Sequence, residues 1–544
     1  MARNRIRLVL AVAALAALGT QQAPRAATTA APPKVVEEVD FAISCSPAVQ
    51  PAFKHAVWTL HSFWYSEALK EFTAVAEQEA GCAMAYWGIA MSHWYPLWYP
   101  PNAASLKAGL EAVEKAMAAP AKTEREQAYI AAIAAFYRDN DKLDHAARAL
   151  AYEKAMEQVY LKYPDDREAA VFYALALDTT APKTDKTYAN QKKAAAILNK
   201  VWKEQPNHPG VVHYLIHSDD SPMFAAAGLD AAICYAKIAP DVPHALHMPS
   251  HIFTRLGMWQ QSIDSNRAAN AAALAYVQKT LGPGGYDGET VHTMDYLEYA
   301  YLQTAQDGAA KVVVDELVAF KKNPGANLPT AYAVAAIPVR FALERRDWKA
   351  AAALTEPSIG FPLDRFPWAE AMIVFGRTLG EAKTGNIAGA QADVAKLQTL
   401  EDKLKGKDPY WANQIEVQRL EAVGILAHVQ GDDAKATAQL RTATELDATM
   451  DKHPATPSPV LPARELLADL LLEINQPAAA LKEYKAVLST DPNRFRSLLG
   501  VARAAQKTGD AVAAHDAYQK LVALGKPSGP ERPELAEAKA HLTN

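Results

Sequence analysis

The sequence predicts an all-α fold: an α-solenoid, in which helix-turn-helix units stack in a row, with degenerate repeats and loop insertions. Three observations support this prediction. The chain is rich in alanine and has few β-branched runs, and only 25 of its 544 residues are glycine, so helix is the favoured local state. Two C-terminal segments align at a fixed offset, AALKEYKAVLSTDP and AAHDAYQKLVALGKP. The pattern of a small residue followed by a larger one recurs through most of the chain.

The C-terminal pair sets the period of the repeat. Three residues recur after 34 positions, Ala480, Tyr484 and Val487 becoming Ala514, Tyr518 and Leu521. This spacing resembles the tetratricopeptide repeat, a unit of two helices with small residues where they cross and a proline near its end, here Pro492. The resemblance, to an exported bacterial member of that superfamily, implies a right-handed superhelix with a concave inner surface and a role in protein interaction.

Weaker copies of the pattern predict how the chain is organised. They run from about residue 50 to the end, with Ala68 and Phe72, or Ser262 and Asn266, in the small and large positions. Long loops between units, such as Ser92–Asn102, either cover a site or serve as hinges and packing. We predict a signal peptide and flexible segment (1–31), N-terminal repeats (32–205), a histidine-rich centre (206–310), helical repeats (311–446) and C-terminal repeats (447–544).

The N-terminus has the pattern of a secretory signal peptide. Basic residues precede an apolar run, Leu8–Leu18, and small and polar residues follow it. The run is shorter than the roughly 20 residues that span a membrane, so we expect no stable membrane insertion, with a retained anchor as the alternative. The expected location is periplasmic or secreted. The formal charge of -5 gives no global attraction to phosphate backbones, so no nucleic-acid partner is expected.

The chain has three cysteines. In an oxidising compartment Cys45 and Cys82 are close enough in sequence to form a disulfide, although the sequence leaves this pairing open. Cys234 lies in an apolar helical stretch and is predicted to be a buried free thiol.

Histidines concentrate in the central repeats. In VPHALHMPSHIFTRLGMW, His244, His247 and His251 are spaced by three and four residues and so share one helical face. By the repeat resemblance they line the concave groove. The preceding unit carries the pair His213 and His217, spaced by four residues. The following unit carries His292 with Asp295, spaced by three.

These residues allow two functions at one location. In the first, the groove holds an unidentified ligand, peptide or partner protein, with His244 and Arg255 as binding residues. In the second, the groove is the site of a metal-dependent hydrolase or oxidoreductase, and Asp295 acts as ligand or base. The expected cofactor is then a divalent metal, zinc or copper, since paired imidazoles suit both. The predicted metal ligands are His213, His217, His247, His251 and His292.

Two other polar residues receive structural interpretations. His61 lies among aromatic residues, and aromatic packing is favoured over ligation. Glu168 stands at a groove-facing start of a helix, where it either contributes a carboxylate to the groove or, as we favour, is an acid that suits the helix dipole.

Overall fold

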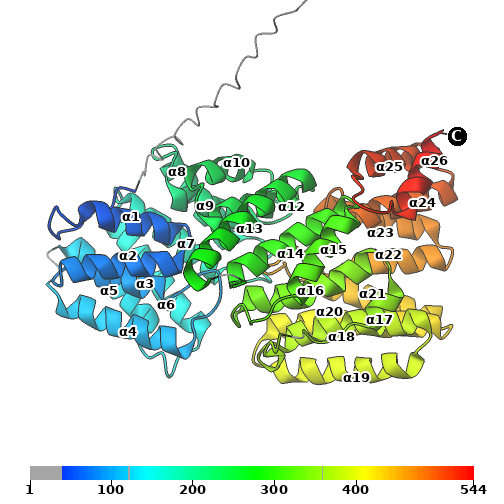
Figure 1. Cartoon of the computed structure of the whole chain (residues 1–544), viewed down its shortest axis with the longest axis horizontal. Helices are drawn as coiled ribbons and strands as arrows, with labels where there is room; N and C mark the ends of the chain where they lie inside the picture. Colours follow the sequence, from blue (N-terminus) through cyan, green and yellow to red (C-terminus); the bar gives the residue numbers. More distant parts are fainter. Residues whose placement is uncertain (1–38, 121–122, 283, 358, 544) are drawn as a thin grey trace, which may run out of the picture. The chain divides into compact units, whose positions relative to one another are not determined.

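The computed structural model describes residues 39–120, 123–282, 284–357 and 359–543, and within these ranges the chain forms helices and no strand. The predicted signal peptide and flexible segment, 1–31, lie outside the described residues. Figure 1 shows the helices in chain order. They are α1 (Gln50–His61), α2 (Tyr65–Gln78), α3 (Ala83–Ser92), α4 (Ala103–Ala118), α5 (Glu124–Tyr137), α6 (His145–Lys162), α7 (Arg167–Thr180), α8 (Ala189–Trp202), α9 (Pro209–Asp219), α10 (Leu229–Ile238), α11 (Pro243–His247), α12 (Pro249–Arg255), α13 (Trp259–Leu281), α14 (Gly288–Gln303), α15 (Asp307–Val318), α16 (Leu328–Glu344), α17 (Trp348–Ala352), the 3-10 helix η1 (Leu363–Arg365), α18 (Pro367–Thr384), α19 (Ile387–Leu404), α20 (Pro409–Val429), α21 (Asp433–Asp447), α22 (Ala463–Glu473), α23 (Pro477–Thr490), α24 (Phe495–Thr508), α25 (Ala511–Leu524) and α26 (Pro533–Thr543).

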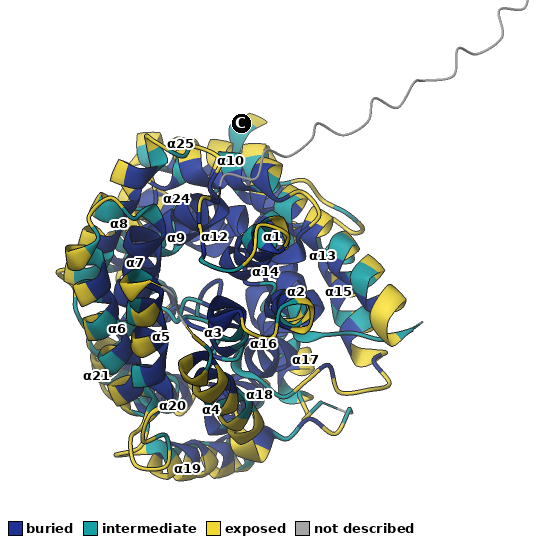
Figure 2. Ribbon diagram, turned by 90° about the vertical axis from the view of Figure 1, so that its left-hand side faces the viewer, coloured by how far each residue is buried: buried dark blue, intermediate teal, exposed yellow. Residues whose placement is uncertain are grey.

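The helices form two layers that alternate along the chain. Most inner helices contact the next inner helix, as α14 does α16, α16 does α18 and α18 does α20. Outer helices, such as α19 and α21, pack against their neighbours in sequence and show the exposed yellow surface in Figure 2. We call inner helices the set α1, α3, α5, α7, α9, α11, α12, α14, α16, α18, α20, α22 and α24.

Burial follows from this layering. The inner helix α18 is buried along most of its length, because it has neighbours on both sides. The outer helix α19 buries a stripe spaced by three or four residues, which includes Ala390, Leu397 and Leu400. Stacked hairpins that share a continuous core define an α-solenoid, so the predicted tetratricopeptide-like fold is confirmed. The predicted domain boundaries stay predictions.

Small residues allow the helices of a unit to cross closely. A Cβ atom on Gly500 of α24 would lie 2.2 Å from the ring of Tyr484 on α23, and one on Gly88 of α3 would lie 2.3 Å from the ring of Phe72 on α2. Ala480 and Ala514, the small residues of the C-terminal repeat pair, are both buried. The repeat pattern therefore marks real helix crossings.

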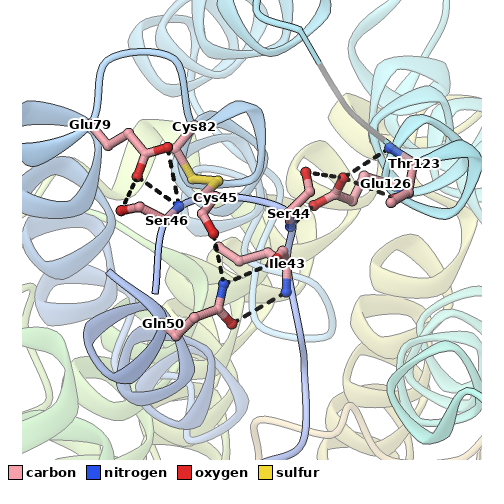
Figure 3. Close-up of a disulfide and its surroundings, with 9 residues drawn as sticks. All are labelled: Ile43, Ser44, Cys45, Ser46, Gln50, Glu79, Cys82, Thr123 and Glu126. Atoms are coloured by element: carbon pink, nitrogen blue, oxygen red, sulfur yellow. Dashed lines mark hydrogen bonds between the residues drawn. A yellow bond between two sulfur atoms is a disulfide. The ribbon is translucent and has the colours of Figure 1, made fainter. Parts of the chain in front are cut away.

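A disulfide between Cys45 and Cys82 fastens the segment before α1 to the start of α3 (Figure 3). Two neighbouring serines support it: the hydroxyl of Ser44 donates to Glu126, and the hydroxyl of Ser46 donates to Glu79, each at 2.6 Å. The structure thus forms the pairing that the sequence left open. Cys234 is a free, half-buried thiol.

The apolar core divides into two large clusters. One extends from Val39 to Phe253, and the next begins at Trp259 and extends to Ala538. The chain passes from the first to the second just after α12, so the histidine-rich helices lie where the two clusters meet. Across the described residues, no helix combines the length and the apolar character that crossing a membrane requires.

Candidate metal centre

Three successive inner stretches bring the predicted histidines together. α9 carries His213 and His217, α11 and α12 carry His244, His247 and His251, and α14 carries His292. α12 contacts α9, and α11 contacts α14. Pro249 begins α12 at a first-turn position, where a missing N–H costs nothing, so the chain continues with little change of direction.

The six histidines form two groups of three. We call His247, His251 and His292 the 247 triad, and His213, His217 and His244 the 213 triad. Within each triad, one ring nitrogen from every histidine lies within 4.8 Å of the others. The 247 triad is buried, each residue being at most 1% exposed. The 213 triad is buried except for His217, which is half-buried.

Hydrogen bonds fix the tautomers in the 247 triad. The Nδ1–H of His247 donates to Oδ1 of Asn266 at 2.6 Å, since the Nδ2 of that amide donates to the carbonyl of Ser262. The Nδ1–H of His251 donates to Asp220 at 3.0 Å. A neutral imidazole carries one N–H, so the Nε2 atoms of His247 and His251 are both bare lone pairs. These two nitrogens lie 3.1 Å apart.

The rings are in the neutral form that binds metals. Burial lowers the pKa of His247 and of His292 well below 6.5, and the neighbouring histidines lower both further. Burial also lowers the pKa of His251 to about 4, even though Asp220 acts in the opposite direction. Two neutral acceptors at 3.1 Å cannot bond to each other, and a cation between them would bind both.

His292 completes this site. Among the described residues, neither of its ring nitrogens has a hydrogen-bond partner, although the side chain is fully buried. Its ring centre lies 4.4 Å from that of His247. A buried imidazole without partners is unfavourable, and a metal ion bound at its lone pair would satisfy one of the two nitrogens.

Asp220, which accepts a hydrogen bond from the proposed ligand His251, is fixed by two ion pairs. Asp220 accepts the His251 N–H and also pairs with Arg255 at 2.9 Å and Lys452 at 2.7 Å. Although burial alone raises it, the pKa of Asp220 is held below its usual range, chiefly by Lys452 and Arg255. Asp220 and Asn266 thus play the part of outer partners that orient ligand histidines.

Aromatic side chains cover the triads. Trp98, from the loop Ser92–Asn102, lies edge-on to His244 and His292 with ring centres 4.9 and 5.0 Å apart. Phe63 contacts His213 and stacks on His217 and His244. The loop therefore lies over the histidines, which do not face an open groove.

Two predicted binding residues have other surroundings than the sequence suggested. Arg255 is the ion-pair partner of Asp220 and lines a pocket of about 350 Å³ together with Lys452. His244, expected to bind a ligand, belongs to the 213 triad, and its Nδ1 atom lies 3.3 Å from Glu289.

Asp295 lies outside both triads. One turn farther along α14 than His292, its carboxylate accepts from Arg340 of α16 at 2.5 Å, beside Glu298. Burial nevertheless raises the pKa of Asp295. Because the Arg340 guanidinium holds it in a buried ion pair, we do not assign it as base or ligand.

A third group of ligand-type side chains has a different hydrogen-bond pattern. His61, Glu168 and His208, called the Glu168 group, are all fully buried and lie within 4.8 Å of one another. The backbone N–H of Val211 donates to Nδ1 of His208, so the His208 proton lies on Nε2 and is donated to Glu168 at 2.8 Å. Every ring nitrogen in this group has a hydrogen-bond partner, so neither imidazole has a free lone pair for an ion.

His61 packs against aromatic rings as expected, stacking on Phe172 with ring centres 4.6 Å apart, and it also bonds to Glu168. The hydroxyl of Tyr214 donates to Nδ1 of His61, whose Nε2–H donates to Glu168 at 2.8 Å. Glu168 lies in the first turn of α7 as expected, but it is fully buried and accepts hydrogen bonds from two histidines. Although burial raises it, the pKa of Glu168 is held well below its usual range by His208 and His61.

Sequence reasoning missed Asn266 and Asp220 as supporting residues. Asn266 had a visible signal, because it is polar in a repeat position where other units carry Phe72 or Leu440. Asp220 follows α9 and meets His251 from 31 residues away, which spacing alone does not reveal.

Comparisons with known proteins find only distant similarity to solved structures. No family model matches the chain, and no curated protein matches it. Among solved structures it is similar to human IFIT1 in a dimer with PPP-AAAA, at 11% identity over 89% of this chain and 96% of that chain, with a TM-score of 0.36. It is also similar to a monomeric IFIT1 mutant with m7Gppp-AAAA, at 12% identity over 88% and 100%, with a TM-score of 0.40. At these TM-scores the likeness carries no argument about function.

Proposed function

We propose that this chain is a metal-binding α-solenoid and that His247, His251 and His292 hold a late first-row ion, copper or zinc. The observation that carries the proposal is the pair of bare Nε2 atoms 3.1 Å apart, each fixed by a hydrogen bond on the far side of its ring. Imidazole suits both of these metals.

The number of ligands favours a reactive site over a structural one. Structural zinc sites have four protein ligands, whereas catalytic sites have three and leave a position for water or substrate. The 247 triad offers three. We therefore propose a metal-dependent enzyme, a hydrolase or an oxidoreductase, in which the open position binds the small molecule that reacts.

The covering side chains argue against a peptide bound at the histidines. Trp98 and Phe63 pack directly against the histidines, and His217 alone among the six is not buried. A water-sized or similarly small ligand needs no such space.

We further propose that the protein is exported, to a periplasm or to the medium. The disulfide between Cys45 and Cys82 supports this location, because disulfides persist in oxidising compartments. The basic and apolar pattern of the N-terminus supports it independently.

Titration calorimetry tests the metal site. Protein purified without a histidine tag and stripped with EDTA is titrated with Zn²⁺ and, separately, Cu²⁺. The double variant His247→Gln/His251→Gln should lose more than about 100-fold in affinity at this site, because removing ligands exceeds the effect of removing an outer partner.

The control is His515→Ala, which removes an exposed histidine of α25 and should bind as the parent does. Circular dichroism must show the same helicity in all three proteins. If the parent and the double variant bound the same number of ions with the same affinity, for both metals, the proposal would be overturned.

A further inference from the structure

The 213 triad repeats the 247 triad at the period of the fold. His247 and His251 lie 34 residues after His213 and His217, respectively. The Nε2 atoms of His213 and His217 are 3.2 Å apart, against 3.1 Å in the other pair. Each pair is completed by one histidine from the next inner stretch: His244 for the first and His292 for the second.

The 213 triad also has nitrogen atoms that lack partners. The Nδ1–H of His213 donates to the carbonyl of His61 at 2.7 Å, which leaves its Nε2 as a lone pair facing His217. Among the described residues, Nδ1 of His217 and Nε2 of His244 have no hydrogen-bond partner, and both atoms are buried. His244 is only 3% exposed.

The two triads lie side by side. The ring centres of His217 and His251 are 5.9 Å apart, and so are those of His244 and His247. Trp98 contacts one ring from each triad, His244 and His292. The triads thus adjoin each other, and the same tryptophan packs against both.

We propose that the protein holds two metal ions next to each other, one on each triad, so that a single small ligand can contact both. The pairing of ions rests on the proposed function, while the second site rests on its own geometry. Enzymes with two neighbouring ions use them to bind both ends of a reacting bond or one shared ligand. Each ion would be held by three imidazoles that come from two neighbouring inner stretches.

The stoichiometry of bound metal tests the pair. EDTA-stripped parent protein, His213→Gln/His217→Gln and His247→Gln/His251→Gln are loaded with Zn²⁺, separated from free ion by gel filtration and analysed for zinc. We expect two ions per chain in the parent and one in each double variant, with two retained in His515→Ala.

The possible failures are distinct. If the parent and the first variant both hold one ion and the second variant none, the second site is refuted and the proposed function stands. If the parent and the second variant both hold one and the first variant none, the proposed function fails. No bound ion in the parent refutes both.

Copper spectroscopy covers the case in which a double variant fails to fold. The parent loaded with two equivalents of Cu²⁺ should show magnetic coupling between the ions, as a half-field signal or as lost intensity in electron paramagnetic resonance. Two uncoupled Cu²⁺ signals at full intensity would overturn the paired arrangement.

Discussion

The 247 triad and the Glu168 group look alike at first: each brings three buried ligand-type side chains within 4.8 Å, on neighbouring inner helices. They differ in where the protons lie. In the Glu168 group the His61 and His208 N–H groups point to a carboxylate, and the network is closed. In the 247 triad the N–H groups of His247 and His251 point away, to Asn266 and Asp220. Proximity alone therefore does not identify a metal site, whereas the direction of the outer hydrogen bonds does.

The largest expected effect concerns the closed network. Glu168→Gln places an amide where two N–H donors need an acceptor, and the backbone bond from Val211 prevents His208 from changing tautomer. We expect the free energy of unfolding to fall by about 3–5 kcal/mol, as when one partner of a buried pair is removed. Urea denaturation measures this change.

The same variant should lose stability without losing the ability to bind metal. Zinc bound per folded chain should be the same in Glu168→Gln as in the parent. A variant that lost zinc while keeping its fold would mean that the Glu168 group, and not the 247 triad, holds the ion.

The next largest effect is on the pH dependence of stability, which should differ between the 247 triad and the Glu168 group. Unfolded histidine has a pKa near 6.5, and that of His251 is about 4 when folded. Between these values the unfolded chain binds a proton that the folded chain does not, so stability is complete above pH 6.5 and falls as the pH drops toward 4. This ring alone contributes roughly 3 kcal/mol.

Glu168 affects stability in a more acidic pH range than His251 does. Its folded pKa is lowered, so its contribution is complete above its unfolded pKa of 4.5 and declines only on further acidification. Urea midpoints of the metal-free protein at several pH values measure both. His251→Gln should flatten the slope between pH 6.5 and 4, and an unchanged slope would contradict the neutral, buried ring.

A smaller effect is expected from an outer partner. Asn266→Ala removes the acceptor that fixes the tautomer and aim of His247. We expect Zn²⁺ affinity to fall by about 10–100-fold, the usual effect of losing such a partner. Competition with a fluorescent chelator measures it, and unchanged affinity would show that the ring is oriented by packing alone.

The smallest effect concerns the cover. Trp98→Phe keeps an apolar ring over His244 and His292, so affinity should change less than about threefold. Quenching of tryptophan emission by Cu²⁺ should drop in this variant and not in the matched control Trp202→Phe, on α8. Equal quenching in both variants would place the ion away from Trp98.

The sequence could predict the fold because the repeat is local. Alanine content, the 34-residue offset of Ala480 and Ala514, and small residues at crossings all reflect contacts within one or two hairpins. The histidine spacing likewise predicts shared faces on successive helices, since three- and four-residue intervals determine a face.

Details of the site depend on contacts between distant units. Arg340 lies 45 residues after Asp295 and forms an ion pair with its carboxylate. No sequence spacing predicts this contact. Glu168 meets His61 from 107 residues away, so the sequence could not show which side chains its carboxylate binds. The loop Ser92–Asn102 is predicted either to cover a site or to serve as a hinge; that its Trp98 covers these histidines depends on contacts across more than a hundred residues, which the sequence does not show.

X-ray absorption at the zinc edge tests the central claim most directly, in protein loaded with one equivalent of Zn²⁺. We predict a first shell that includes three nitrogen atoms at about 2.0–2.1 Å, with the outer-ring scattering typical of imidazole. That scattering should fall when His247→Gln/His251→Gln is added to protein that already carries His213→Gln/His217→Gln, in which the 213 triad can no longer take up the ion. A first shell of oxygen atoms without imidazole scattering, or a spectrum that this variant leaves unchanged, would contradict the assignment of the 247 triad as the metal site.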